Sequence, residues 1–248
     1  MKKNETKTGW DLLSDLLKKG IFPSRLTSLL LWGPPGTGKS TWARSVFGPD
    51  RCEIVPLSDG VDQFGLLGAM LPASENGTPV IRWTDGPAAR AVREGKILIL
   101  DEVDQHSPEL RPILHALTET DPSQIRVRTA DGGYLTPALG FGVVCTSNKS
   151  PDSLPEALRT RLLSVYVGTP CPQLLETLNG SFADFFVANY SRLPVPSYSA
   201  PISPRAGLQI RTLVMHGMTP DAALRAVFGQ DVPAGIADAL TLAMGPQA

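Results

Sequence analysis

The sequence predicts an α/β fold, in which a parallel sheet flanked by helices is followed by a small all-helical domain. Three observations support this prediction. A glycine-rich stretch at residues 33–40 separates an apolar run from a segment that can form a helix. The apolar runs at 97–100 and 141–146 have the unbroken character of strands that are buried on both faces of a sheet. After Pro170, every periodic stretch has helical spacing.

Helices and strands alternate along the first two thirds of the chain. N-cap pairs such as Ser107-Pro108 and glycine stops such as Gly95 delimit the helices, and turn pairs such as Asn76-Gly77 indicate hairpins. In chain order we expect a helix at 10–17, a strand at 28–32, a helix at 41–47, a strand at 53–57, a hairpin within the less regular residues 58–86, a helix at 87–94, a strand at 97–102, a helix at 107–119, a second hairpin at 126–135, a strand at 141–146, a helix at 154–162 and a strand at 164–167.

The composition excludes several classes of protein. Hydrophobic residues make up 42% of the 248 residues and charged residues 19%, which is typical of a globular protein. The net charge of −1 provides no global basic field for nucleic acid. No apolar run approaches the roughly 18 residues of a membrane span, so we expect no membrane partner and a cytoplasmic location. We interpret the three widely spaced cysteines as small buried residues in a reducing compartment, and the three histidines as surface or structural: Cys52, Cys145, Cys171, His106, His115 and His216.

The glycine-rich stretch has the spacing G-x-x-x-x-G-K-[ST] between a strand and a helix, which is typical of a loop that binds polyphosphate. Its glycines let backbone N–H groups face an anion, and the following helix adds the partial positive charge of its N-terminus. Lys39 supplies a charge for the β- and γ-phosphates, and the Ser40 hydroxyl is a candidate ligand for Mg²⁺. The candidate nucleotide-binding residues of this loop are Gly33, Pro34, Pro35, Gly36, Thr37, Gly38, Lys39, Ser40 and Thr41.

Two carboxylates, Asp101 and Glu102, follow the apolar run at 97–100. The carboxyl ends of parallel strands are where open α/β sheets bind ligands. Asp101 is therefore a candidate nucleotide-site and Mg²⁺ ligand, and Glu102 a candidate base that activates a water against the γ-phosphate. The alternative is an exposed strand end with ordinary solvated acids.

Three further positions carry groups suited to phosphate chemistry. Asn148 follows the next buried strand, where an amide can orient the attacking water, although it can also simply form a turn. Arg159 and Arg161 are expected on different sides of a helix, and either can be an ordinary surface ion-pair residue. Arg205 places a cation in the first turn of a helix, which the helix dipole disfavours unless an anion lies nearby. That anion is either a bound γ-phosphate or a neighbouring acidic side chain.

Taken together, these motifs resemble those of AAA+ ATPases, in the dynein-related group that contains MoxR-type chaperones, magnesium-chelatase ATPase subunits and the ATPases that activate rubisco or nitric oxide reductase. Residues 33–40 look like Walker A, 97–102 like Walker B, and Asn148 like sensor 1. Residues 83–87 are similar to that group's W-x-D-G-P segment, and 203–206 to its sensor-2 S-P-R-A segment. Residues 154–162 resemble L-P-E-A-L-x-x-R-F, with Arg161 at the finger position and Leu162 in place of the usual Phe. The two hairpins look like the group's two inserts.

The resemblance implies an AAA+ core at residues 1–169 and a helical lid domain at 170–248. It implies Mg²⁺-dependent hydrolysis of ATP in a homo-oligomeric ring, most often a hexamer, with Arg161 or Arg159 acting on a neighbouring subunit's ATP. The partner would be a client or adaptor protein, one candidate being a protein with a von Willebrand factor A domain, which the ring remodels or activates. The alternative is a nucleic-acid-directed motor similar to McrB-like restriction or replication ATPases, because basic and aromatic side chains lie on the hairpins: Trp83, Arg126, Arg128 and Tyr134.

Overall fold

The computed structural model describes residues 7–57, 60–129, 132–178, 180, 183–185, 204–229 and 235–244. The chain divides into two compact units. One contains residues 1–33 and 43–166, and the other contains residues 34–42 and 167–248. The glycine-rich loop therefore belongs to the same unit as the C-terminal helices, while the strand before it belongs to the first unit.

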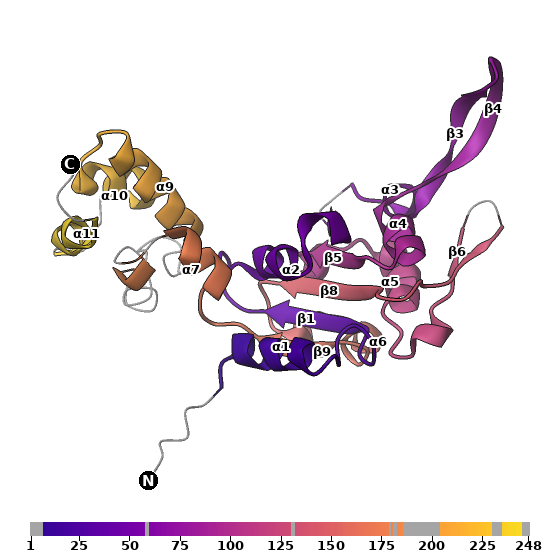
Figure 1. The fold of residues 1–248 in the computed structure, drawn as a ribbon, viewed down its shortest axis with the longest axis horizontal. Helices are drawn as coiled ribbons and strands as arrows, with labels where there is room; N and C mark the ends of the chain where they lie inside the picture. Colours follow the sequence, from indigo (N-terminus) through magenta and orange to yellow (C-terminus); the bar gives the residue numbers. More distant parts are fainter. Residues whose placement is uncertain are drawn as a thin grey trace, which may run out of the picture. The chain divides into compact units, whose positions relative to one another are not determined.

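The first unit contains a five-stranded parallel sheet in the order β2-β5-β8-β1-β9 (Figure 1). Side chains on alternate positions face opposite sides of a sheet. Leu30, Leu98 and Val143 lie in one large apolar cluster, and their neighbours Leu29 and Ile99 are buried as well, so both faces are covered. The predicted parallel sheet is confirmed. Its strands are β1 (Ser28–Trp32), β2 (Cys52–Pro56), β5 (Ile97–Asp101), β8 (Gly142–Ser147) and β9 (Leu163–Tyr166).

Short helices surround this sheet. α1 packs against β9, and α4 packs against β2 and β5. Thr8 and Asp11 form a reciprocal capping box at the start of α1. The helices of this part of the chain are α1 (Gly9–Lys18), α2 (Lys39–Phe47), which continues from the glycine-rich loop, α3 (Gln63–Leu67), α4 (Pro87–Glu94), α5 (Arg111–Leu117) and α6 (Glu156–Arg159).

Two predicted helices are shorter in the structure. The helix expected at 107–119 is a 3₁₀ turn at Pro108–Leu110 followed by α5. Pro112 has no N–H for the carbonyl of Pro108, so a regular α-helix cannot run through both prolines. The helix expected at 154–162 is reduced to α6, because the chain closes with tighter bonds, Arg161 N–H to Leu158 O among them, before it enters β9.

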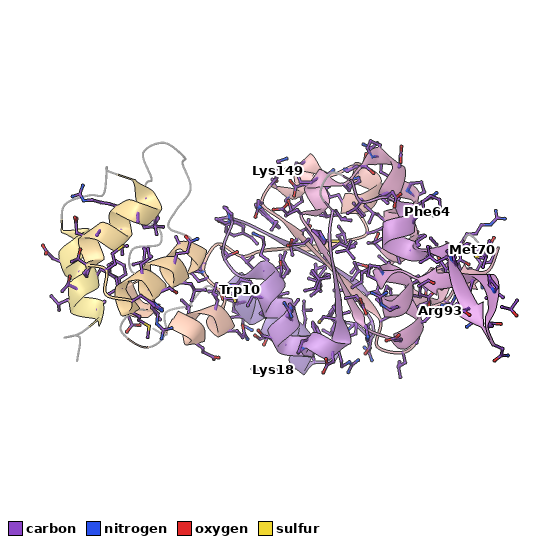
Figure 2. All side chains as sticks on the ribbon, turned by 90° about the horizontal axis from the view of Figure 1, so that it is seen from above. Trp10, Lys18, Phe64, Met70, Arg93 and Lys149 are labelled. Carbon is purple, nitrogen blue, oxygen red and sulfur yellow. The ribbon has the colours of Figure 1, made fainter. Side chains whose placement is uncertain are left out.

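The region at 58–86 is more ordered than expected. The Asp62 side chain caps α3, a helix that the sequence analysis did not predict. The hairpin predicted within this region occupies residues 68–85, where β3 (Gly68–Glu75) pairs along its whole length with β4 (Thr78–Asp85). It projects beyond the five-stranded sheet, and Met70 lies on it with its side chain 46% exposed (Figures 1 and 2). The second predicted hairpin is present as β6 (Val127–Arg128) and β7 (Tyr134–Leu135).

The C-terminal unit is helical in its described residues, as the sequence predicts. Its apolar centre contains Ile210, Val214, Leu224 and Leu240. The Thr219 side chain accepts a hydrogen bond from the Ala222 N–H and so caps the N-terminus of α10. The helices are α7 (Pro172–Leu178), α9 (Pro204–Met215), α10 (Pro220–Phe228) and α11 (Ile236–Met244). Among the helices of the described ranges, none combines the length and the apolar character that crossing a membrane requires.

Candidate active site

The glycine-rich loop follows β1 directly. The Gly33 N–H bonds to the carbonyl of Ser147 at the end of β8, with an N···O distance of 3.3 Å. Gly33, Gly36 and Gly38 have φ values of 148°, 76° and 86°, a region that side chains with a Cβ rarely adopt. The path of this loop therefore depends on its glycines, as expected for a backbone that wraps an anion.

Inside the loop, two side chains converge on one backbone carbonyl. The Lys39 ammonium donates to Pro34 O at 2.9 Å, and the Thr37 hydroxyl is 3.2 Å from the same oxygen. Both side chains are buried, with Lys39 only 7% exposed. Ser40 and Thr41 lie in the first turn of α2, half-buried and exposed respectively. An ammonium held this way against the loop carries its charge to the place where phosphate oxygens would lie.

Cys171 supports the loop from the start of the C-terminal helices. Its N–H bonds to Thr37 O at 2.8 Å, and its Sγ would lie 2.6 Å from a Cβ added to Gly38. Burial raises the pKa of this thiol, and the side chain packs against the loop. The prediction of buried cysteines is confirmed for Cys171 and Cys145, while Cys52 is half-buried. The contact with the loop was not predicted, because nothing in the local sequence links Cys171 to Gly38.

At the end of β5, Asp101 and Glu102 share one partner. The Thr146 hydroxyl donates to Asp101 Oδ1 and accepts from the Glu102 N–H at 3.1 Å. Thr146 is 2% exposed, so this arrangement is shielded from water. The sequence analysis missed Thr146. One signal could have identified it. The predicted strand at 141–146 is apolar except for Thr146, and this strand lies next to β5, which ends at the two acids.

Glu102 has an unusual backbone. Its φ and ψ of 56° and 49° lie in the left-handed region, and its side chain is exposed. A non-glycine residue there is strained by about 1–3 kcal/mol, a cost found most often at functional sites. This left-handed residue directs the chain from β5 into a 3₁₀ turn at Val103–Gln105. The two acids thus differ in environment, since Asp101 is half-buried and Glu102 is exposed.

Asn148 lies immediately beyond β8 and is exposed. Ser147 holds the turn on both sides of it, since its hydroxyl accepts from the Lys149 N–H at 2.9 Å and donates to Lys149 O at 3.1 Å. The Lys149 ammonium pairs with Asp104 at 3.2 Å, and the Asp104 side chain is 3% exposed. The loop that carries Asn148 is therefore tied to the segment that follows Glu102.

The two candidate finger arginines have different surroundings. Arg161 pairs with Glu119 at 3.0 Å and is 30% exposed. Arg159 pairs with Asp152 at 2.7 Å, and that carboxylate is 82% exposed. Because α6 ends at Arg159, Arg161 lies beyond the helix, and the expectation that both arginines occupy one helix is wrong.

Arg205 lies in the first turn of α9, as predicted, and its side chain is outside the described residues. Among the described residues there is no cluster of three or more His, Cys, Asp or Glu side chains that could hold a metal ion. Mg²⁺ in nucleotide sites is usually held by one or two protein groups together with waters and phosphates. The hydroxyl of Ser40 and the carboxylate of Asp101 are each an oxygen ligand of the kind that Mg²⁺ takes.

Comparison with known proteins identifies relatives of the chain. A family model described as an AAA domain of the dynein-related subfamily matches residues 28–162. Protein NorQ of Paracoccus denitrificans is 28% identical over 216 residues, which cover 86% of this chain and 70% of that protein. An uncharacterised protein of Staphylococcus haemolyticus is 32% identical over 146 residues, or 56% of this chain and 55% of that protein. YojN of Bacillus subtilis, also uncharacterised, is 26% identical over 200 residues, or 75% of this chain and 65% of that protein. The chain thus spans between about half and two thirds of the length of these last two relatives.

Solved structures share the fold. NtrX from Brucella abortus in complex with ATP has a TM-score of 0.53 and 16% identity, over 93% of this chain and 56% of that chain. Hsp104 with ATPγS and casein has a TM-score of 0.53 and 14% identity, over 88% of this chain and 44% of that chain. At this level of identity the likeness concerns the fold alone.

Proposed function

The chain belongs to the dynein-related subfamily of AAA domains, and on that premise we propose that it is a Mg²⁺-dependent ATPase that acts as a cytoplasmic homo-oligomeric ring on a partner protein. The observation that carries this proposal is the pair of acids at the end of β5, where Thr146 binds both Asp101 and the Glu102 backbone. It supports two separate roles for adjacent carboxylates, which hydrolysis needs and a passive nucleotide-binding module does not.

The glycine-rich loop would bind the triphosphate. Its left-handed glycines favour inward N–H groups, and Lys39 would contribute its charge to the β- and γ-phosphates. Ser40 and Asp101 would hold Mg²⁺, which neutralises charge on the phosphate oxygens when bound. Glu102 would accept a proton from the attacking water, and Asn148 would orient that water. Arg205 would contact the γ-phosphate from the first turn of α9.

A neighbouring subunit would complete the site. A guanidinium supplied in trans raises the rate by roughly 10³–10⁵ in related phosphate-loop enzymes, equivalent to about 4–7 kcal/mol of barrier. Arg161 and Arg159 are the candidates in this chain. A ring, most often a hexamer, follows from such a site, and hydrolysis should then depend on protein concentration.

The similarity to NorQ over 86% of this chain supports a MoxR-like activator that remodels a client or adaptor protein. One candidate partner is a protein with a von Willebrand factor A domain. Co-purification of partners with the Glu102→Gln variant in the presence of ATP identifies the client directly, because a ring that binds but does not hydrolyse ATP should retain it.

Glu102→Gln also tests the chemistry. The variant should bind ATP with wild-type affinity and hydrolyse it at least about 10²-fold more slowly, because the base is removed while the binding residues stay. Glu109→Gln, which changes an exposed acid on the 3₁₀ turn at Pro108–Leu110, is the matched control and should behave as wild type. Rapid turnover by Glu102→Gln would overturn the role of Glu102.

A second candidate is a nucleic-acid-directed motor. It is favoured by the exposed pair of Arg128 and Tyr134, which face each other across β6 and β7, with Arg126 also exposed beside them. Stimulation of the ATPase by DNA, weakening steeply with salt, supports this alternative, and stimulation by a client protein alone supports the first.

A further inference from the structure

The two candidate finger arginines differ in how firmly their guanidinium groups are held. The Arg159–Asp152 pair lies mostly in solvent, with the side chains 39% and 82% exposed. The Arg161–Glu119 pair is more protected, at 30% and 27%. Two exposed side chains lose little of their mobility when they pair, whereas partly buried partners on separate elements restrict one another.

The guanidinium of Arg161 is fixed on three sides. Its Nε donates to Glu119 Oε1 at 3.1 Å and its Nη1 donates to Ala157 O at 2.5 Å, and Nη2 lies 3.0 Å from the same Glu119 oxygen in the ion pair. A guanidinium has five N–H donors. Within the part of the chain that the structure describes, the hydrogen bonds use the Nε–H and one N–H of Nη1, so that both Nη nitrogens keep N–H groups that can face a ligand.

Glu119 is itself anchored to the sheet. Its backbone carbonyl accepts the hydroxyl of Thr27 at 2.7 Å, and Thr27 is 1% exposed at the start of β1. The neighbouring Thr118 is fully buried at the end of α5. The backbone of Glu119, just beyond α5, is therefore tied to the residue that precedes β1, and its carboxylate reaches Arg161 from that anchored position.

We propose that Arg161 is the arginine that acts on the neighbouring subunit's ATP and that Glu119 is its positioning residue. This inference rests on the proposed function, a ring ATPase. Glu119 sets the orientation of the guanidinium before assembly, so that its outward N–H groups meet the phosphate oxygens without a search over rotamers. Such preorganisation acts on the rate and not on nucleotide binding, because the neighbour's own loop binds the nucleotide. Arg159 stays an ordinary surface residue.

A double-mutant cycle on the full chain tests this proposal. Glu119→Ala should lower kcat about tenfold and leave KM for ATP within about twofold, a loss typical of a displaced catalytic group. In an Arg161→Ala background the same change should have no further effect, since a positioning residue acts only through the group it positions. Glu119→Gln keeps an acceptor oxygen and should recover most of the rate. Asp152→Ala, which removes the partner of Arg159, is the matched control and should keep wild-type kcat.

A mixing experiment assigns the effect to the interface. Glu102→Gln subunits lack the base but carry an intact Glu119 and Arg161. When they are mixed with Glu119→Ala subunits, they should supply a well-oriented Arg161 to the intact sites of those neighbours. The rate of hydrolysis per Glu119→Ala subunit should therefore rise. Thermal unfolding of each variant checks folding, and Glu119→Leu, which removes the acceptor oxygens but keeps the side-chain bulk, carries the test if Glu119→Ala is unfolded.

Three results would overturn the positioning role. One is a wild-type kcat in Glu119→Ala together with an inactive Arg161→Ala. This result would reject the role of Glu119 but not the proposed ATPase function. Another is a faster rate in Glu119→Ala, which would mean that Glu119 sequesters the finger. The third is independent, multiplying losses in the double variant. Wild-type activity in Arg161→Ala would instead show that Arg161 does not act on the neighbouring subunit's ATP. Glu119 could then have no effect on the rate by positioning Arg161.

Discussion

The backbone N–H of Cys171 donates a hydrogen bond to the carbonyl oxygen of Thr37, with an N···O distance of 2.8 Å. This bond joins the glycine-rich loop to the segment that opens the C-terminal helices, within one compact unit. The thiol next to it occupies the space above Gly38. The shape of the loop therefore depends on a residue far from it in the sequence.

Enlarging that side chain should weaken nucleotide binding. Cys171→Leu adds atoms where Gly38 already lies close to Sγ, and overpacking of about 1–3 kcal/mol would displace the loop. We expect the Kd for a fluorescent ATP analogue to rise about tenfold or more. Cys171→Ala retains the N–H and removes only the sulfur, so it should bind nearly as wild type. Equal affinity of the Leu variant and wild type would contradict a supporting role.

Removing the Thr146 hydroxyl should impair hydrolysis more than binding. Thr146→Val has nearly the same shape, leaves Asp101 Oδ1 and the Glu102 N–H without this partner, and should cost about 1–3 kcal/mol of unfolding free energy. With both acids less well oriented, kcat should fall roughly 10- to 10²-fold while the Kd for ATP changes little. Denaturant unfolding and steady-state ATPase assays measure the two effects.

Ser28→Ala is the control for Thr146→Val. It removes another buried hydroxyl, at the amino end of β1, that has no hydrogen-bond partner among the described residues. Its unfolding free energy and kcat should stay close to wild type. If kcat fell in both variants, the loss in Thr146→Val would be explained by general loosening of the sheet and not by the Thr146 hydroxyl.

Asp85 should hold the base of the β3–β4 hairpin. Its carboxylate accepts from the Trp83 indole N–H at 2.5 Å and pairs with Arg93 on α4 at 2.9 Å, and its carbonyl accepts from Arg90 at 2.9 Å. Figure 2 shows Arg93 close to this base. Asp85→Ala should raise amide hydrogen exchange throughout β3 and β4 while the sheet core is unaffected, because an isolated hairpin is marginal.

The matched control for this prediction is Glu75→Ala. It removes the ion pair of Glu75 with Arg82 near the hairpin tip, where both side chains are 45% or more exposed. Surface pairs of this kind contribute about 0–1 kcal/mol, so exchange should change little. Equal changes in hydrogen exchange in the two variants would show that the interactions of Asp85 do not hold the β3–β4 hairpin in place.

The stability contributed by Glu53 should depend on pH. Hydrogen bonds from Arg90, with burial opposing, lower the pKa of this carboxyl below its ordinary value of 4.5, and Lys96 adds to the lowering. Because the folded-state pKa is the lower one, the stabilisation is fully present above pH 4.5 and is lost as the pH falls through the folded-state pKa.

Glu53→Gln should therefore cost about 1–2 kcal/mol of unfolding free energy at pH 7, and the difference from wild type should vanish in acid. Urea unfolding between pH 7 and pH 3 measures it. Asp121→Asn is a suitable control: Ser123 lowers the pKa of this exposed carboxyl through local hydrogen bonds, so it should show a much smaller difference. A constant difference across the pH range would contradict the ionic origin.

Much of the site could be predicted from the sequence because its signals are local. The glycine spacing, the following helix and the two acids after an unbroken apolar strand are read within a few residues of one another. The hairpin at 68–85 was only partly foreseen, since its strands show no regular alternation and its length depends on pairing. The helix at 107–119 was overestimated, since the run of apolar residues concealed the effect of Pro112.

The sequence by itself determined the main order of strands, loops and helices and the identity of the groups that we propose for phosphate chemistry. Only the tertiary structure decided what supports them: Thr146 under Asp101 and Glu102, Cys171 against the glycine-rich loop, and Glu119 beside Arg161. Thr146 is 45 residues from Asp101, and Glu119 is 42 from Arg161. Contacts of this range arise from the register of strands and the packing of elements, and no local pattern encodes them. The glycine-rich loop, evident from its spacing alone, acquires its shape from a residue that only the folded chain brings to it.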